Sequence, residues 1–247
     1  MSECWKRWLV LALMGAGAVV SGCSENESSI YIRSVLAPNS NCLYVADPAS
    51  EMLGSGTMDI GLTYEYKASL LVGNQLVGRG SSESLRTETS TFIAEGMEVR
   101  VERANASKDI LSEYTVSVTG VSDASTGSSP GWGIVDTVAV NSAASQAILS
   151  IFENAESNVG LLRVVSVMRV WGKTLGGREV ESGEFRFPIA VCIGCLPFVP
   201  PDAVDSAGPS CIIGTGSYAT PCRFGQDEPV DCRLCLGLKY PASICIP

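Results

Sequence analysis

The stretch Glu184–Val191, with the sequence EFRFPIAV, decides the fold class of this chain. Large apolar side chains stand at every second position from Phe185 onward, and smaller or polar residues stand between them. Because successive side chains of a strand point to opposite faces, this spacing predicts a strand with one buried face. Pro188 has no N–H to donate, so we expect an edge or a bulge at that point of the strand.

The same alternation recurs upstream, from about residue 30 onward. The period-two runs cover Ile60–Tyr66, Ala68–Val72, Met97–Glu102 and Tyr114–Thr119. The run Leu161–Trp171 is apolar on both faces, which predicts a central strand covered on both sides, and Leu175–Arg178 after it predicts a tight turn. Short strands separated by Gly, Ser and Asn predict a mainly β fold over residues 30–191. We expect an antiparallel β-sandwich, immunoglobulin-like in outline.

One segment of this domain has helical spacing instead. The run from Ser142 to Ala155 places apolar residues three and four positions apart, which predicts a short amphipathic helix. Asn141 or Ser142 is a suitable N-cap, because a short polar side chain can accept a hydrogen bond from the first turn.

The composition changes at Cys192, where a cysteine-rich tail of residues 192–247 begins. It contains Cys192, Cys195, Cys211, Cys222, Cys232, Cys235 and Cys245. Pro, Gly and Ser fill much of the space between them, so the tail has too few large apolar residues for a core of its own. In an exported protein, disulfides compensate for a small core. We expect a loop-dominated, disulfide-rich tail packed on the sandwich.

The number of cysteines suggests one long-range disulfide. The tail contains seven, and Cys42 is the one remaining cysteine once Cys4 and Cys23 are assigned to export and lipidation. If all eight form disulfides, Cys42 must bond to a tail cysteine and staple the tail to the sandwich. Eight cysteines allow 105 connectivities, among which the sequence does not choose.

Two pairs have CxxC spacing, Cys192/Cys195 and Cys232/Cys235. Structural disulfides are the favoured interpretation. A Cys4 zinc site is disfavoured, because 36 residues separate the pairs where 15–20 are usual. Thiol–disulfide exchange is also disfavoured, because Cys192 follows a strand pattern and no helix start is visible there to lower a thiol pKa.

Composition excludes several functions. The chain contains no histidine, so a Ser-His-Asp triad, a Cys-His pair and an HExxH zinc site are impossible. The formal charge of −9 argues against nucleic acid as a partner. We expect no enzyme activity, no catalytic residue, no metal and no cofactor.

Three weaker patterns have simpler explanations. The segment Gly214–Ala219 matches GxGxxA but lacks the strand and helix that a dinucleotide site requires. The glutamates at 179, 181 and 184 are typical of a solvated hairpin. Trp132 lies between two glycines and is expected to fold back from a loop onto the core.

The N-terminus carries an export signal. Lys6 and Arg7 precede an apolar run, Leu9–Val20, which is shorter than the roughly 20 residues that span a bilayer. Ser21 and Gly22 then precede Cys23. This pattern resembles the lipobox of bacterial lipoproteins. The resemblance implies that residues 1–22 are removed, that Cys23 is lipidated, and that residues 23–29 form the anchor and tether.

The whole chain resembles the uncharacterised envelope lipoproteins of myxobacteria and related bacteria. The resemblance rests on the lipobox, Leu70–Leu76 (LLVGNQL), Gly183–Ile189 (GEFRFPI) and Gly225–Cys235 (GQDEPVDCRLC). It implies no known activity. The expected function is that of an exported protein anchored to the membrane through Cys23, with Ser24 favouring the outer membrane. It would be a non-enzymatic binding or structural module with a protein or glycan partner. The alternative is a periplasmic thiol–disulfide redox protein that uses a CxxC pair.

Overall fold

The computed structural model describes residues 28–81, 83, 85–104, 109–154, 160–205, 208–212 and 218–246. The predicted export segment 1–22, the predicted lipidation residue Cys23 and residues 24–27 of the tether lie outside this range. Most of the GxGxxA match, residues 214–217, also lies outside it.

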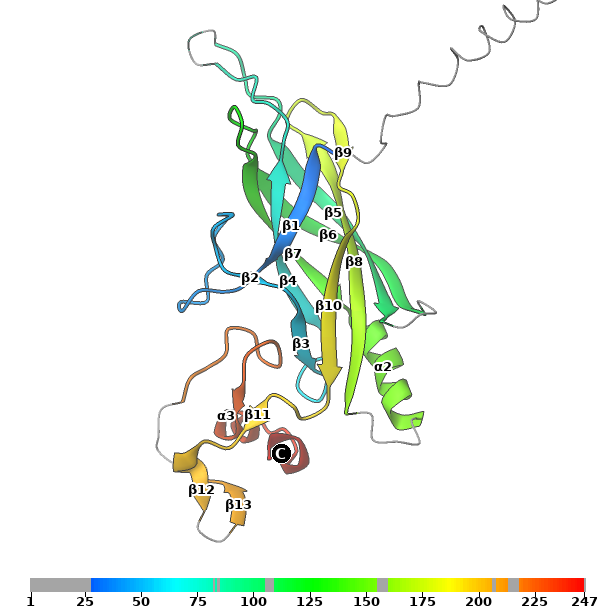
Figure 1. Ribbon diagram of the computed structural model, residues 1–247, viewed down its shortest axis with the longest axis vertical. Helices are drawn as coiled ribbons and strands as arrows, with labels where there is room; N and C mark the ends of the chain where they lie inside the picture. The colour runs from blue at the N-terminus through cyan, green and yellow to red at the C-terminus, as the bar shows by residue number, and fades with distance from the viewer. Residues whose placement is uncertain are drawn as a thin grey trace, which may run out of the picture.

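The fold is the predicted β-sandwich, built from two sheets (Figure 1). The smaller sheet has the order β2 (Met52–Leu53), β1 (Ile30–Leu36), β4 (Tyr66–Asn74), β7 (Gly131–Val140). The larger has the order β3 (Gly56–Asp59), β10 (Phe185–Cys192), β8 (Leu161–Thr174), β5 (Phe92–Arg103), β6 (Ile110–Ser122), and β9 (Glu179–Glu181) pairs with β8. All pairs within these two sheets are antiparallel except β3 with β10. That parallel pairing begins at Ile189, one residue after Pro188.

The core between the sheets consists of the apolar positions that alternate along the strands. In the larger sheet these include Met97, Val99, Val101, Val164, Met168, Val170, Phe187, Ile189 and Val191, and in the smaller sheet Leu70, Val72 and Val135. Tyr66, Phe92 and Phe187 are the largest side chains that are fully buried. Burial of this apolar surface is the main force that holds the two sheets together.

The predicted helix is present as α2 (Ser142–Asn154). Asn141 is its cap, because the Asn141 side-chain oxygen accepts a 2.9 Å hydrogen bond from the backbone N–H of Ala144. Ala144 and Ile148 of this helix are buried in the sandwich core.

The strand predicted over Ile60–Tyr66 is wrong. β3 ends at Asp59, and β4 begins only at Tyr66. The Asp59 carboxylate accepts a hydrogen bond from the N–H of Gly61, and the Asp59 carbonyl accepts two more, from Leu62 and Thr63. An aspartate that satisfies the following backbone groups in this way turns the chain out of the strand.

The prediction that Leu161–Trp171 forms a central strand is correct, but the prediction that both of its faces are covered is wrong. β8 is central, between β10 and β5. Its outward face, however, is not covered by a second sheet: Leu161 is 47% exposed, and the buried Val167 lies between its register partners, Arg100 of β5 and Arg186 of β10. Long charged side chains on the neighbouring strands therefore cover part of this outward face, where the sequence predicted a strand covered on both sides.

The tail lies beyond the end of the sandwich at which β3 and β10 meet (Figure 1). Its elements are β11 (Pro197–Phe198), η1 (Pro201–Ala203), β12 (Val204–Asp205), β13 (Gly208–Cys211), β14 (Val230–Asp231), α3 (Cys232–Gly237) and α4 (Ala242–Cys245). Val230, Cys235 and Cys245 form a small cluster with Leu62 of the sandwich. None of the helices in the described part of the chain has the length and apolar character needed to cross a bilayer.

The side chain of Gln226 helps to dock the tail on the smaller sheet. The Gln226 side-chain oxygen accepts a 3.0 Å hydrogen bond from the N–H of Lys67, and its side-chain nitrogen donates one of 3.0 Å to the Lys67 carbonyl. The amide of Gln226 thus pairs with β4 as a neighbouring strand would, and both backbone groups of Lys67 are satisfied.

Candidate functional site

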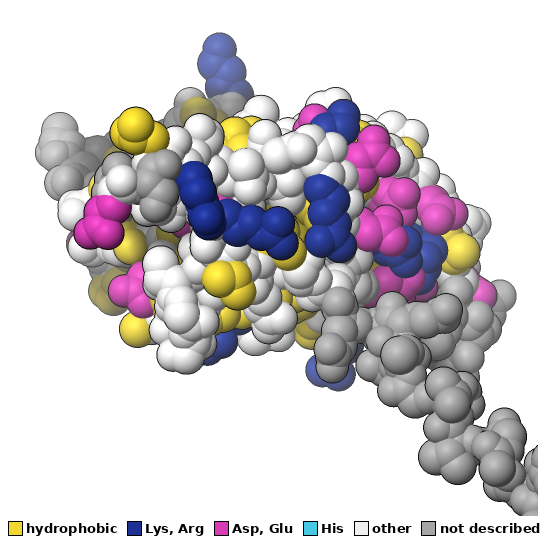
Figure 2. Space-filling view, turned by 90° about the horizontal axis from the view of Figure 1, so that it is seen from above, with side chains coloured by type: hydrophobic (Ala, Val, Ile, Leu, Met, Phe, Trp, Pro, Cys, Tyr) yellow, Lys and Arg dark blue, Asp and Glu magenta, His cyan; other side chains and the backbone are white. Residues whose placement is uncertain are grey.

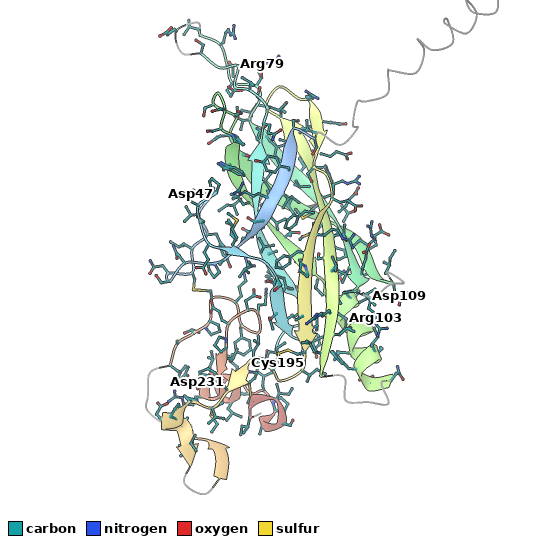
Figure 3. The ribbon with its side chains drawn as sticks, viewed as in Figure 1. Asp47, Arg79, Arg103, Asp109, Cys195 and Asp231 are labelled. Carbon is teal, nitrogen blue, oxygen red and sulfur yellow. A yellow bond between two sulfur atoms is a disulfide. The ribbon has the colours of Figure 1, made fainter. Side chains whose placement is uncertain are left out.

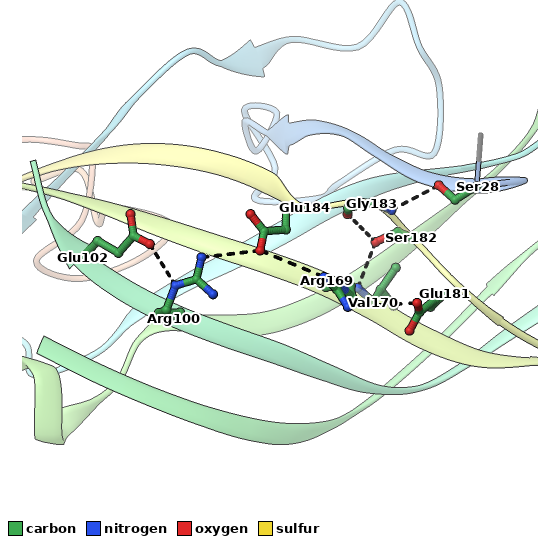
Figure 4. Close-up of polar contacts among 9 residues, drawn as sticks. All are labelled: Ser28, Arg100, Glu102, Arg169, Val170, Glu181, Ser182, Gly183 and Glu184. Atoms are coloured by element: carbon green, nitrogen blue, oxygen red, sulfur yellow. Dashed lines mark hydrogen bonds and ion pairs between the residues drawn. The ribbon is translucent and has the colours of Figure 1, made fainter. Parts of the chain in front are cut away.

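The outer face of the larger sheet carries a network of charged side chains (Figure 4). Glu102 is the most buried member of this network, with its side chain only 6% exposed. Its carboxylate oxygens lie 2.8 Å from the guanidinium of Arg100 and 2.7 Å from that of Arg186. Hydrogen bonds from Arg100 and then Arg186 hold the pKa of the Glu102 carboxyl below its usual value. Arg100 also reaches Glu184, at 3.4 Å.

The network continues toward the other end of the strands. Arg169 of β8 lies 4.0 Å from both Glu181 and Glu184. Seen from above the molecule of Figure 1, acidic side chains gather at one side around a few basic ones (Figure 2). Such exposed pairs contribute little to stability.

A groove of about 470 Å³ opens on this face. It is lined by Glu95, Trp171, Gly172, Lys173, Glu179, Val180 and Glu181. That volume is within the range of sites for small molecules, roughly 300–1,000 Å³. The groove is bounded by three strands, β5, β8 and β9, of which β8 supplies its aromatic side chain.

A β-bulge shapes the groove. Ala94 pairs with Gly172 and Gly96 with Trp171, so Glu95 is an extra residue with no partner in β8. The indole of Trp171 lies against Gly96, where any Cβ would overlap the ring. The bulge and the missing side chain together leave room for Trp171 to lie on the strand with its other side toward the groove.

Charged groups surround the half-buried indole. Glu181 stands directly across from Trp171 and Glu179 directly across from Lys173 in the β8–β9 pair. Lys173 lies 3.5 Å from Glu95. Three carboxylates and one ammonium group therefore line the groove, a formal charge of −2, and Arg169 lies 4.0 Å from one of these carboxylates, that of Glu181. An aromatic face next to negative charge attracts a cationic ligand.

No protein-family model matches this chain, and no curated protein matches it.

The eight candidate cysteines form four disulfides in the structure. The pairs are Cys42–Cys222, Cys192–Cys195, Cys211–Cys232 and Cys235–Cys245. Cys42 is thus bonded across 180 residues to a tail cysteine. The two cysteines of the second CxxC, Cys232 and Cys235, are buried and bonded to different partners. Only the first CxxC closes on itself.

A second cluster of chemical groups surrounds that first CxxC. It consists of Asp59, Cys192 and Cys195, each of which has one metal-ligating atom within 4.8 Å of those of the other two. Among the residues that the structure describes, this is the one group of three such side chains. Asp59 and Cys192 are buried, and Cys195 is exposed. Carboxylate and thiolate are both zinc ligands, so these three residues could hold a metal when the sulfurs are reduced.

The three glutamates and Trp132 lie only partly where the sequence predicts them. Glu179 and Glu181, interpreted as a solvated hairpin, line the groove, whereas Glu184 pairs with Arg100 and Arg169. Trp132 lies in strand β7 instead of a loop, with its ring 5.8 Å from that of Tyr31. Trp171 was missed, although its outward position between Arg169 and Lys173 was a usable signal.

Proposed function

We propose that this chain is a lipid-anchored protein of the bacterial cell envelope. The lipobox resemblance at Cys23 is the basis for the anchor. Four disulfides are in keeping with an oxidising compartment outside the cytosol. The test of this part is lipid incorporation: wild-type protein should take up labelled fatty acid and fractionate with membranes, and Cys23→Ser should do neither.

We further propose that the anchored protein is a non-enzymatic binding module and that its ligand is a glycan that carries free amino groups. The observation that carries this proposal is the groove around Trp171. Sugar rings stack on an indole, their hydroxyl groups hydrogen-bond to carboxylates, and a protonated amine is attracted by Glu95, Glu179 and Glu181. A glycan is favoured over a protein partner because the groove is small and charged, whereas the core of a protein interface is depleted of charge.

A matched pair of ligands tests the charge requirement. Oligomers of glucosamine and of N-acetylglucosamine share ring and linkage, but only the first carries ammonium groups. Calorimetry with the detergent-solubilised full chain should show at least tenfold tighter binding of the glucosamine oligomer. Equal binding of both, or binding of neither with capture of a lysine-rich peptide instead, contradicts the proposal.

Variants assign the binding to the groove. Trp171→Ala should weaken glucosamine-oligomer binding at least tenfold, because it removes both the stacking of a sugar ring and the cation–π contact, the second of which contributes about 0.5–1 kcal/mol at an exposed site. Glu179→Gln with Glu181→Gln should also weaken it. Glu153→Gln, on the exposed surface of α2, is the matched control and should leave binding unchanged. A site elsewhere would respond to none of the groove variants.

Thiol–disulfide exchange is the second candidate function. The specific observation in its favour is the bond between Cys192 and Cys195, with Cys195 exposed. It predicts that a dithiol reduces this pair under native conditions and that the reduced protein transfers the electrons to a disulfide substrate. Thiol titration without denaturant distinguishes this function from a purely structural role.

A further inference from the structure

We infer that Asp59, Cys192 and Cys195 form a binding site for a divalent zinc-type cation when the Cys192–Cys195 disulfide is reduced. The site lies where the tail leaves the sandwich, at the end of β10 (Figure 3). It is separate from the Trp171 groove, and neither proposal depends on the other. In the structure the sulfurs of Cys192 and Cys195 are joined in a disulfide.

The backbone brings the three groups together. β3 and β10 are parallel neighbours, and Asp59 and Cys192 are partners in their register at the end of both strands. Gly194 then adopts a positive φ of 69°, which lets the loop fold back and place Cys195 beside Cys192. The two sulfurs and a carboxylate oxygen converge within 4.8 Å, a separation that ligands of one metal ion can share.

The carboxylate of Asp59 is anchored by backbone groups alone. Oδ1 accepts hydrogen bonds from Gly61 and Gly194, and Oδ2 accepts one of 3.1 Å from Leu196. Among the described residues, no salt bridge reaches Asp59, although it is fully buried. A carboxylate has about four acceptor positions, so one remains on Oδ2 for a cation. These hydrogen bonds from backbone N–H groups fix the orientation of the Asp59 carboxylate, as outer-shell hydrogen bonds do for metal ligands in general.

The remaining requirements are access and charge. Cys195 is exposed, so a metal ion or a reductant reaches the site from solvent. Two thiolates and a carboxylate would supply three anionic ligands to Zn²⁺, which would leave one of its usual four positions for water. Three protein ligands with one open position is the arrangement found in catalytic rather than structural zinc sites.

The chemistry balances with a dithiol as reductant. A thiolate of the dithiol attacks Sγ of Cys195, the Cys192–Cys195 bond breaks, and Cys192 leaves with the electron pair and takes up a proton. The second thiol of the reductant then displaces Cys195, so the reductant ends as a disulfide and the protein as two thiols. Metal binding releases both thiol protons, as ligation of cysteine requires.

The other disulfides are poorer sites. Cys232, Cys235 and Cys245 are buried, and their bonds lie within the tail. Cys42 is exposed like Cys195, and its bond to Cys222 is therefore the competitor that an experiment must separate.

The experiment uses the full chain in detergent with a limiting amount of a phosphine reductant, which supplies the two electrons in place of the dithiol and, with water, ends as the phosphine oxide. Alkylation and peptide mapping should find the first free thiols at Cys192 and Cys195. Co²⁺ should then bind one to one, with the near-ultraviolet thiolate-to-cobalt band and the visible bands of tetrahedral cobalt, and Zn²⁺ should displace it. First thiols at Cys42 and Cys222, or no cobalt bands, overturn the inference.

Three variants assign the ligands. Cys195→Ser should abolish the thiolate-to-cobalt band, while the double variant Cys42→Ser/Cys222→Ser should keep it. Asp59→Asn should weaken Co²⁺ binding at least tenfold while both thiols still form. If this variant loses its native circular dichroism, the two cysteine variants decide. Cobalt bands that survive Cys195→Ser, or tight binding by a folded Asp59→Asn protein, overturn the three-ligand site.

Discussion

The phenol of Tyr66 donates a 2.7 Å hydrogen bond to the carboxylate of Asp227, 161 residues away. Tyr66 is fully buried in the sandwich core, and Asp227 belongs to the tail. The other carboxylate oxygen of Asp227 accepts a 2.8 Å hydrogen bond from the N–H of Thr57. Burial raises the pKa of the Asp227 carboxyl, and these hydrogen bonds partly offset that effect. The tail is therefore docked on the sandwich by partly buried polar contacts as well as by a disulfide.

Tyr66→Phe should lower the free energy of unfolding by about 1–3 kcal/mol. The change removes the hydroxyl and leaves a partly buried carboxylate oxygen without that partner, which costs more than the mean value of a hydrogen bond. Urea unfolding of the oxidised protein measures the effect. Tyr64→Phe is the matched control. Because Tyr64 is 58% exposed, loss of its hydroxyl should change the free energy of unfolding little. Equal stability of the two variants would show that the Tyr66–Asp227 contact is energetically unimportant.

The two disulfides with an exposed cysteine should differ in their effect on stability. Cys42–Cys222 closes a separation of 180 residues and Cys192–Cys195 one of 3. On the chain-entropy model these stabilise the folded state by about 5 and about 2 kcal/mol. Replacing each pair by serine and comparing denaturant midpoints checks the order. A larger loss for the Cys192/Cys195 variant would contradict the assignment of Cys42–Cys222 as the staple.

Glu102 should make stability depend on pH. Its folded pKa is lowered, so its contribution is fully present above the unfolded value, about 4.3, and is lost as the pH falls through the folded value. Glu102→Gln should therefore cost about 1 kcal/mol at pH 7, a value reduced because Arg186 is partly exposed. Below pH 3 the difference from wild type should shrink toward zero. Thermal unfolding across this range is the measurement, and a constant difference would refute the ion-pair explanation.

Gly96→Ala should displace the indole of Trp171, since an added Cβ would overlap its ring. The mature chain predicted from the sequence contains two tryptophans, Trp132 and Trp171, so Trp132→Phe leaves Trp171 as the reporter. In that background, Gly96→Ala should shift the tryptophan emission and weaken binding of the glucosamine oligomer at least tenfold. Gly160→Ala is the control, because a Cβ there meets no atom within 4 Å. An unchanged emission spectrum would mean that the position of the Trp171 indole does not depend on Gly96.

Local patterns in the sequence were enough for the fold class. The alternation in Met97–Glu102, Tyr114–Thr119 and Phe185–Val191 matches strands, and the spacing after Asn141 matches a capped helix. These predictions succeed because a strand or helix with one apolar side must bury it. The pattern failed at Ile60–Tyr66, where Asp59 turns the chain by a hydrogen bond that hydrophobic periodicity does not register.

The amino-acid sequence alone determined the alternating strands and the count of cysteines that leaves Cys42 to bond with the tail. The export signal also comes from the sequence alone, and it remains a prediction. The tertiary structure decided that Cys42 bonds to Cys222 and that Asp59 lies beside Cys192 and Cys195. It also decided that Trp171 lies on Gly96 among three glutamates. The physical reason is that strand pairing and register join residues far apart in the chain, whereas periodicity reports only on neighbours.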